Sequence, residues 1–140
     1  MSNKIYFGHP INTYDTELEN HLLQRISEVF PLLFIENPNE EYHQEGYQFW
    51  KRLSGNGMNY YYKEILPTCN AGIFLPFRDG KWGAGVFAEA EFLHNKGCPI
   101  FQIDMKGMVT KIDDLSAVEV LSIEETRKRI RTESGETVPY

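Results

Sequence analysis

A glutamate at the start of a helical segment is the residue of this chain best placed to do chemistry. Glu89 follows an apolar run and a loop that contains Gly80, Gly83 and Gly85, and it stands about one turn into the next segment. A carboxylate can act as a nucleophile or stabilise a developing positive charge, and the first-turn amides of a helix favour its ionised form. The same pattern also suits a glutamate that only interacts with the helix dipole, because glycines are ordinary turn residues.

Two loops provide further polar side chains. Asp79 lies ten residues before Glu89, where it could hold a hydroxyl group, protonate a leaving group or simply stand in a solvated turn. The other loop follows the first apolar run and contains Gly8, His9, Pro10 and Asn12. His9 could contact a ligand or be a hydrogen-bonded structural residue. Tyr6, just before this loop, could belong to the core or line a pocket.

The elements that must position these loops follow from the apolar pattern. Strands are expected at 4–8, 32–35, 71–77 and 99–103, with weaker ones at 109–112 and 118–121. The run at 32–35 is continuously apolar, which is typical of a strand buried on both faces. Helices are expected behind the capping residues Thr16 and Glu19, at 47–53, 59–66 and 86–96, and behind Ser122 and Glu125.

This alternation predicts an α/β fold of the Rossmann or flavodoxin-like type, a parallel sheet of about five strands sandwiched by helices. Ligands of such sheets bind beyond the carboxyl ends of the strands. The loops at 8–14 and 78–85 are therefore expected to meet at one pocket. We expect one domain at 1–132, followed by a flexible tail at 133–140.

The composition excludes several classes of function. The net charge of −6 argues against binding of polymeric nucleic acid, although a single nucleoside or nucleotide can bind at a local site. The beginning of the chain is too polar for a signal peptide, and no apolar run approaches the ~20 residues of a membrane helix. We expect a cytoplasmic protein that contacts no membrane. The two cysteines, Cys69 and Cys98, form no metal-binding spacing, and no metal or other cofactor is expected.

Two segments resemble the nucleoside 2-deoxyribosyltransferase family. The run IYFGHPIN is similar to the opening strand and substrate loop of that family. The runs Gly85-Val86-Phe87-Ala88-Glu89 and Gly97-Cys98-Pro99-Ile100 are similar to its Gly-x-x-x-Glu helix start and to the turn before its next strand. The resemblance extends over roughly residues 3–131. It implies that Glu89 is the nucleophile in the cleavage or transfer of the N-glycosidic bond of a (deoxy)nucleoside or nucleotide, through an oxocarbenium-like sugar.

The resemblance also implies roles for other residues. Asp79 would be a second catalytic residue, and the substrate would contact Tyr6, Gly8, His9, Pro10, Asn12, Gly83, Gly85 and Tyr62. Pro10 stands where nucleotide-hydrolysing relatives tend to have a hydroxyl residue, which argues against a monophosphate. A homo-oligomer, at least a dimer, is expected because the family often completes its site across subunits. A surplus of aromatic residues agrees with this expectation: Tyr60, Tyr61, Tyr62, Phe87 and Phe92.

One departure from the family leaves alternatives open. The stretch Asn59–Glu64 lacks the aspartate that the family has before its central strand. Tyr61 or Tyr62 could replace it as a hydroxyl donor, stack on a base or simply pack in the core. The missing aspartate favours a non-catalytic nucleotide-binding module, whereas Glu89 and Asp79 favour an enzyme. An NAD glycohydrolase-like enzyme is a further alternative, because related folds cleave the nicotinamide bond by similar carboxylate chemistry.

Overall fold

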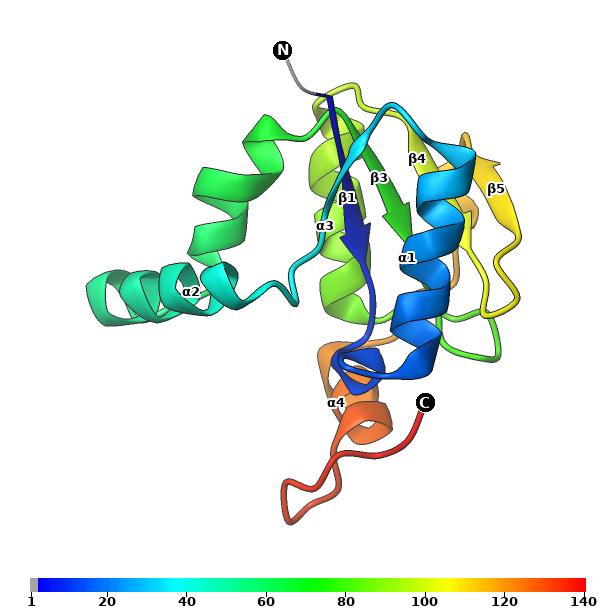
Figure 1. Cartoon of the computed structure of the whole chain (residues 1–140). Helices are drawn as coiled ribbons and strands as arrows, with labels where there is room; N and C mark the ends of the chain where they lie inside the picture. Colours follow the sequence, from blue (N-terminus) through cyan, green and yellow to red (C-terminus); the bar gives the residue numbers. More distant parts are fainter. Residues whose placement is uncertain (1–2) are drawn as a thin grey trace.

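The computed structural model describes residues 3–140 and shows an α/β fold built on one five-stranded sheet (Figure 1). The strands are β1 (Lys4–Gly8), β2 (Phe34–Glu36), β3 (Ala71–Phe74), β4 (Ile100–Ile103) and β5 (Val109–Ile112). Their order across the sheet is β2-β1-β3-β4-β5. Neighbouring pairs among the first four strands are parallel, and β5 runs antiparallel to β4. The expected α/β class is confirmed.

The expectation of a purely parallel sheet is wrong at β5. The chain between β4 and β5 turns back at once, with Met108 accepting a hydrogen bond from Asp104 and Gly107 in the left-handed region at φ 86°. A parallel connection needs a crossover of a dozen residues or more, whereas a short turn joins antiparallel strands. The length of this loop therefore decides the direction of β5.

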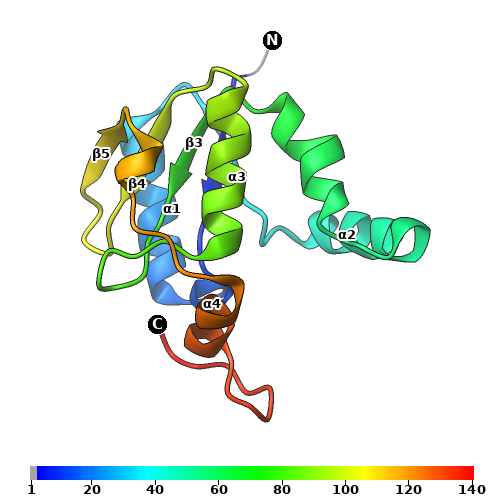
Figure 2. The same cartoon turned by 180° about the vertical axis from the view of Figure 1, so that it is seen from behind.

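Helices cover both faces of the sheet. The helices are α1 (Glu17–Val29), α2 (Glu41–Ser54), α3 (Ala84–Asn95) and α4 (Ile123–Ile130). Figures 1 and 2 show α1 on one face, α3 on the other and α2 set off to one side of the body. The segment expected as a helix at 59–66 is a π-helical turn, Tyr61–Ile65, followed by a 3-10 turn at Leu66–Thr68. Further 3-10 turns lie at Ile11–Thr13 and Leu115–Ala117.

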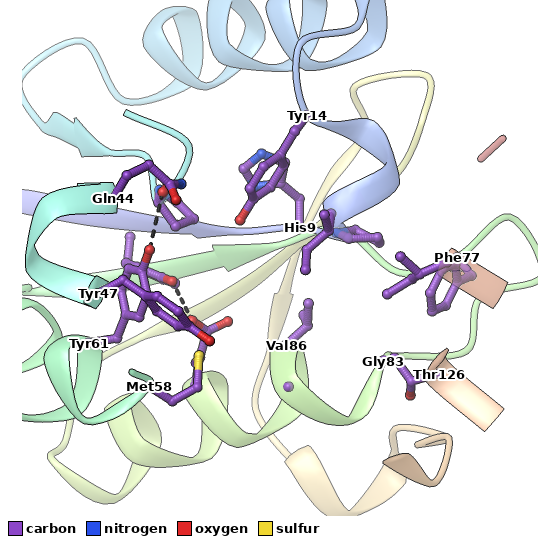
Figure 3. A pocket seen from close by; sticks show the side chains of 17 residues that line it. His9, Tyr14, Gln44, Tyr47, Met58, Tyr61, Phe77, Gly83, Val86 and Thr126 are labelled. Atoms are coloured by element: carbon purple, nitrogen blue, oxygen red, sulfur yellow. Dashed lines mark hydrogen bonds between the residues drawn. The ribbon is translucent and has the colours of Figure 1, made fainter. Parts of the chain in front are cut away.

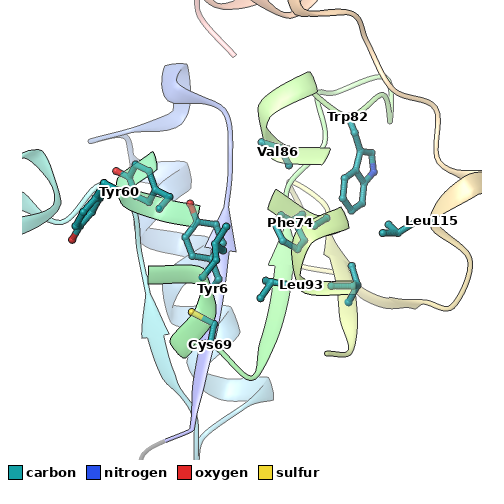
Figure 4. Close-up of a cluster of buried hydrophobic side chains, with 12 residues drawn as sticks. Tyr6, Tyr60, Cys69, Phe74, Trp82, Val86, Leu93 and Leu115 are labelled. Carbon is teal, nitrogen blue, oxygen red and sulfur yellow. The ribbon is translucent and has the colours of Figure 1, made fainter. Parts of the chain in front are cut away.

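The core lies in two layers because side chains alternate along each strand. On the α1 side, Ile5 and Phe7 of β1 pack with Leu22 and Ile26. On the α3 side, Tyr6 packs in a cluster that includes Phe74, Trp82, Val86 and Leu93 (Figure 4). The alternation therefore turns the ring of Tyr6 toward α3, the helix that contains Glu89.

Two other strand expectations need correction. The segment expected as a strand buried on both faces, 32–35, instead leads into the edge strand β2. Leu32 before this strand is 91% exposed, and Phe34, its first residue, is 56% exposed. The expected strand at 118–121 forms only one isolated bridge, between Val120 and Trp82. The sequence pattern shows that a segment is apolar. Which strands and helices cover that segment depends on the strand order of the sheet.

The tail at 133–140, which was expected to be flexible, makes specific contacts. The Val138 amide donates to the Ile130 carbonyl at 2.7 Å. The Tyr140 hydroxyl donates to the Pro76 carbonyl at 2.5 Å, and its ring stacks on Phe77. Within residues 3–140, none of the helices is long and apolar enough to cross a membrane.

Candidate functional site

A pocket of about 430 Å³ lies beyond the carboxyl ends of β1 and β3 (Figure 3). The chain passes from β1 to β2 on one side and then returns to β3 on the other, so these two ends border a point where the strand order reverses. Open α/β sheets bind ligands at such a point, and the volume is typical of small-molecule sites. The two loops contribute lining residues as expected: His9, Pro10, Ile11 and Tyr14 from one, Phe77, Gly83, Gly85 and Val86 from the other.

Glu89 lines this pocket and is 7% exposed. Its carboxylate accepts a hydrogen bond from the hydroxyl of Tyr6, which is fully buried. Gly8 allows the close approach of β1, because a Cβ there would lie 3.4 Å from Glu89 Oε1 and 2.5 Å from the Phe74 ring. The structure thus brings together Tyr6, Gly8 and Glu89, three of the residues singled out in the sequence.

Burial controls the ionisation of this pair. Burial raises the pKa of Glu89 to about 8, although the hydrogen bond from Tyr6 acts in the opposite direction. Burial, together with the Glu89 carboxylate, raises the pKa of Tyr6 well above its usual range. Tyr6 therefore remains a donor, and Glu89 is mostly protonated near pH 7. Among the side chains described, Glu89 is the only carboxylate in the lining.

The remaining lining is mostly aromatic and apolar. Gln44 and Tyr47 come from α2, and Tyr61 comes from the π-helical turn that follows it. The Tyr61 hydroxyl donates to the Pro38 carbonyl at 3.3 Å. Burial raises the pKa of Tyr61 and of Tyr14, so both stay protonated. Figure 3 shows Tyr47 and Tyr61 on the side of the pocket opposite Phe77.

His9 lines the pocket, and it also has a structural partner. Its Nε2 lies 2.7 Å from Glu19 Oε2, its Nδ1 lies 2.9 Å from the Phe7 carbonyl, and its ring stacks on Phe7. Each ring nitrogen faces an oxygen, so the imidazole is held from both sides. Burial raises the pKa of Glu19, but the hydrogen bond and charge of His9 bring it below its usual value. This buried pair fixes the loop that follows β1.

Asp79 is not in the pocket, contrary to expectation. Its carboxylate forms a two-pronged ion pair with Arg129 of α4, at 2.7 and 2.9 Å. Hydrogen bonding to Arg129 lowers the pKa of Asp79 to about 2. The loop turns tightly at Gly80, whose amide bonds to the Phe77 carbonyl, and Asp79 stands at this turn. The sequence placed it in the correct loop, but only α4 decided its partner.

Asn12 and Tyr62 also lie outside the pocket lining. The Asn12 amide donates to the carbonyls of Arg129 and Val138, which ties the loop after β1 to α4 and the tail. Tyr62 packs on Phe92 and against the core, and burial raises its pKa to about 12. Of the two tyrosines considered as hydroxyl donors, the pocket therefore contains Tyr61.

Sequence reasoning missed the contribution of α2 and α4. Gln44 and Tyr47 line one side, while Thr126 and Ile130 of α4 line another. The signal for α2 was its spacing, because residues three apart share a helix face.

Buried contacts hold α2 in place. Fully buried His43 lies 2.7 Å from Glu36 Oε1 and 2.6 Å from the Tyr60 hydroxyl. The tyrosine cluster therefore attaches α2 to the sheet. The inference of surplus aromatics is wrong, because Tyr60 and Tyr61 are buried core residues and Tyr62, Phe87 and Phe92 pack against that core.

Comparison with known proteins gives no family assignment. No protein-family model, curated protein or solved structure matches this chain. Among residues 3–140, no group of three or more His, Cys, Asp or Glu side chains is arranged to hold a metal ion. The function must be argued from the chemistry of the pocket.

Proposed function

We propose that this chain cleaves or transfers the N-glycosidic bond of a (deoxy)nucleoside or nucleotide, with Glu89 as the nucleophile. The main support is one observation: a buried carboxyl group, hydrogen-bonded to buried Tyr6, lines a largely aromatic pocket at the switch point of the sheet. Such a pocket suits a ligand that has both a flat base and a sugar. The resemblance to the nucleoside 2-deoxyribosyltransferase family assigns the same role to Glu89.

In the first step the ionised Glu89 carboxylate attacks C1′ of the sugar. The bond between C1′ and the base nitrogen breaks, its electron pair leaves with the base, and an ester forms between C1′ and Glu89. The departing base takes a proton from solvent. Burial raises the pKa of Tyr61, so its hydroxyl is a poor acid and can only donate a hydrogen bond to the base.

In the second step an acceptor attacks C1′ and releases the Glu89 carboxylate. If the acceptor is water, its proton passes to solvent and free sugar is the product. If the acceptor is a second base, the proton on its attacking nitrogen passes to solvent and the exchanged nucleoside is the product. The Tyr6 hydroxyl donates to Glu89, so it stabilises the carboxylate that leaves C1′ and orients its free oxygen.

A non-catalytic nucleotide-binding module is the second candidate. Among the described side chains, Asp79 is absent from the lining and Glu89 has no carboxylate partner there. Glycosidases commonly use a pair of carboxylates, one of which protonates the leaving group. Binding of a nucleoside without base release would support this second function.

The test is incubation with a panel of nucleosides, nucleotides and NAD, followed by chromatography of the released base. A 2′-deoxynucleoside given together with a second free base distinguishes transfer from hydrolysis. We expect the chain to release base from at least one of these compounds, and we expect this release to depend on Glu89. Release from none of these compounds, at protein concentrations that bind them, would contradict the enzymatic proposal.

Three variants sharpen this test. Glu89→Gln preserves shape but removes the negative charge, and loss of a nucleophile commonly lowers the rate by about three orders of magnitude or more. Glu91→Gln is the matched control, because Glu91 is exposed on the same helix. Asp79→Asn should retain most activity if the ion pair with Arg129 is the role of Asp79.

A further inference from the structure

Helix α2 presents an apolar stripe to solvent. Tyr42, Phe49 and Leu53 are 52%, 53% and 65% exposed. Their spacing of seven and four residues places them in one row along the helix. His43, whose side chain is fully buried against the sheet, lies about 100° around the helix from Tyr42. The Tyr42 hydroxyl donates to Glu36 of β2, but half of the Tyr42 side chain stays exposed. The stripe therefore lies beside the buried side of α2, and both views show α2 beside the body of the molecule (Figures 1 and 2).

Charges flank this stripe in a self-complementary order. Exposed Glu45 lies toward the beginning of α2, and exposed Arg52 lies toward its end, on the same edge of the stripe. The two residues are about 10 Å apart along the axis, at 1.5 Å per residue. When two copies of α2 pack antiparallel across a two-fold axis near Phe49, each Glu45 faces the Arg52 of the other copy. The same register places Tyr42 near Leu53 of the other copy.

We propose that this face of α2 binds a second copy of the chain, forming an isologous dimer through antiparallel packing of α2. Two facts favour a second copy over an unrelated protein: the charge order matches its own two-fold image, and the apolar stripe is centred on the same axis. Isologous contacts require such self-complementarity. Antiparallel packing also brings opposite ends of the two helix dipoles together.

The size of the patch indicates a weak dimer. Three half-exposed side chains of this size present roughly 300 Å² per copy. A stable interface buries about 800 Å² per partner. The stripe alone is smaller than a stable interface, so we expect the dimer to form only at high protein concentration. The proposal does not depend on the proposed function, because its test measures mass rather than base release.

The test is sedimentation velocity of the full chain at protein concentrations from about 1 to 500 µM. Wild type should show reversible monomer–dimer behaviour. Glu45→Arg places Arg opposite Arg twice, and Arg52→Glu places Glu opposite Glu twice. Each variant should raise the dissociation constant by about tenfold or more. A mixture of the two variants pairs opposite charges at both places, and it should form a heterodimer close to wild type in affinity.

Other outcomes would overturn the proposal. If wild type remains monomeric up to the highest concentration, this face of α2 does not bind a second copy. A different protein would then be the partner that covers it. Dimers that neither charge reversal weakens would place the interface elsewhere. The control for the apolar part is Phe49→Ser, which should weaken association while circular dichroism stays unchanged, because the ring is half exposed.

Discussion

At the scale of single residues, the pair of Tyr6 and Glu89 combines two opposing effects. Burial favours the neutral carboxyl group, whereas the hydrogen bond from Tyr6 favours the carboxylate. The first effect is the larger, so the pKa of Glu89 lies at about 8. Glu89 is therefore only partly ionised at neutral pH. This affects both the rate of the proposed reaction and the stability of the folded chain.

The rate should depend on pH with a limb near pH 8. If ionised Glu89 is the nucleophile, kcat/KM should rise by about tenfold per pH unit below that value and level off above it. Tyr6→Phe removes a hydrogen bond that favours the carboxylate, so the limb should move to higher pH. Initial rates from roughly pH 5 to 10 test both statements. A rate that falls through the same range would show that Glu89 works in its protonated form.

Stability should show the opposite dependence on pH. The pKa of Glu89 is about 8 in the folded chain against an ordinary value of 4.5. Between these values the folded state keeps a proton that the unfolded state releases, so stability falls as pH rises toward 8. Gln cannot ionise, so the free energy of unfolding of Glu89→Gln should increase relative to that of wild type over this pH range. The increase should be up to about 1.4 kcal/mol for each pKa unit.

Urea denaturation at about pH 5, 7 and 9 measures this difference. The free energy of unfolding of Glu89→Gln minus that of wild type should increase with pH. Glu91→Gln is the control, because Glu91 is exposed and its replacement should follow wild type. A constant difference between Glu89→Gln and wild type would contradict the raised pKa.

At the scale of elements, two helical glycines have opposite surroundings. In α2, a Cβ at Gly46 would lie 2.1 Å from the ring of Tyr60. In α3, a Cβ at Gly85 would meet no atom within 4 Å. Gly46 thus lets α2 approach the tyrosine cluster and supply Gln44 and Tyr47 to the pocket, whereas packing gives no reason for glycine at Gly85.

Alanine at these two glycines should change stability in opposite directions. Gly46→Ala should lower the free energy of unfolding by about 1–3 kcal/mol, because the added methyl group overpacks against Tyr60. This loss should exceed the gain from the higher helix propensity of alanine. Gly85→Ala should raise it by up to ~1 kcal/mol, but it should weaken substrate binding because Gly85 lines the pocket. Thermal denaturation and KM test the pair. Equal stabilisation by both would show that α2 is not held against Tyr60.

At the scale of the whole molecule, contacts over long sequence distances close one end of the sheet. Arg129 pairs with Asp79, Asn12 binds the Val138 carbonyl, and Tyr140 binds the Pro76 carbonyl. Together they join α4 and the tail to the loops after β1 and β3. These contacts also support the side of the pocket that contains Phe77, on which the Tyr140 ring stacks.

Tyr140→Ala should therefore destabilise the chain by about 1–3 kcal/mol. The substitution removes the hydrogen bond to Pro76 and the ring contacts with Phe77 and Arg78. Glu133→Ala, in the exposed part of the tail, should change stability by less than about 0.5 kcal/mol. Chemical denaturation of the two variants is the measurement. Equal, negligible effects would support the expectation of a flexible tail.

The sequence by itself determined the local elements and the candidate loops. Apolar periodicity predicted β1, β3, β4 and the helices around them, and the capping box of Ser122 and Glu125 is present as expected. Glu89 could be placed near the start of its helix because glycine punctuation and helical spacing are local signals. The two loops at the carboxyl ends of β1 and β3 could be brought together because parallel strands end at one edge.

Only the tertiary structure decided which side chains meet. The edge position of β2, the partner of Asp79 and the contribution of α2 to the pocket all depend on contacts between distant parts of the chain. The hydrogen bond between Tyr6 and Glu89 joins residues that are 83 positions apart. The burial that raises the pKa of Glu89 arises from the same long-range packing. Local patterns fix which face a side chain takes, but the neighbours on that face, and therefore its charge state, come from packing.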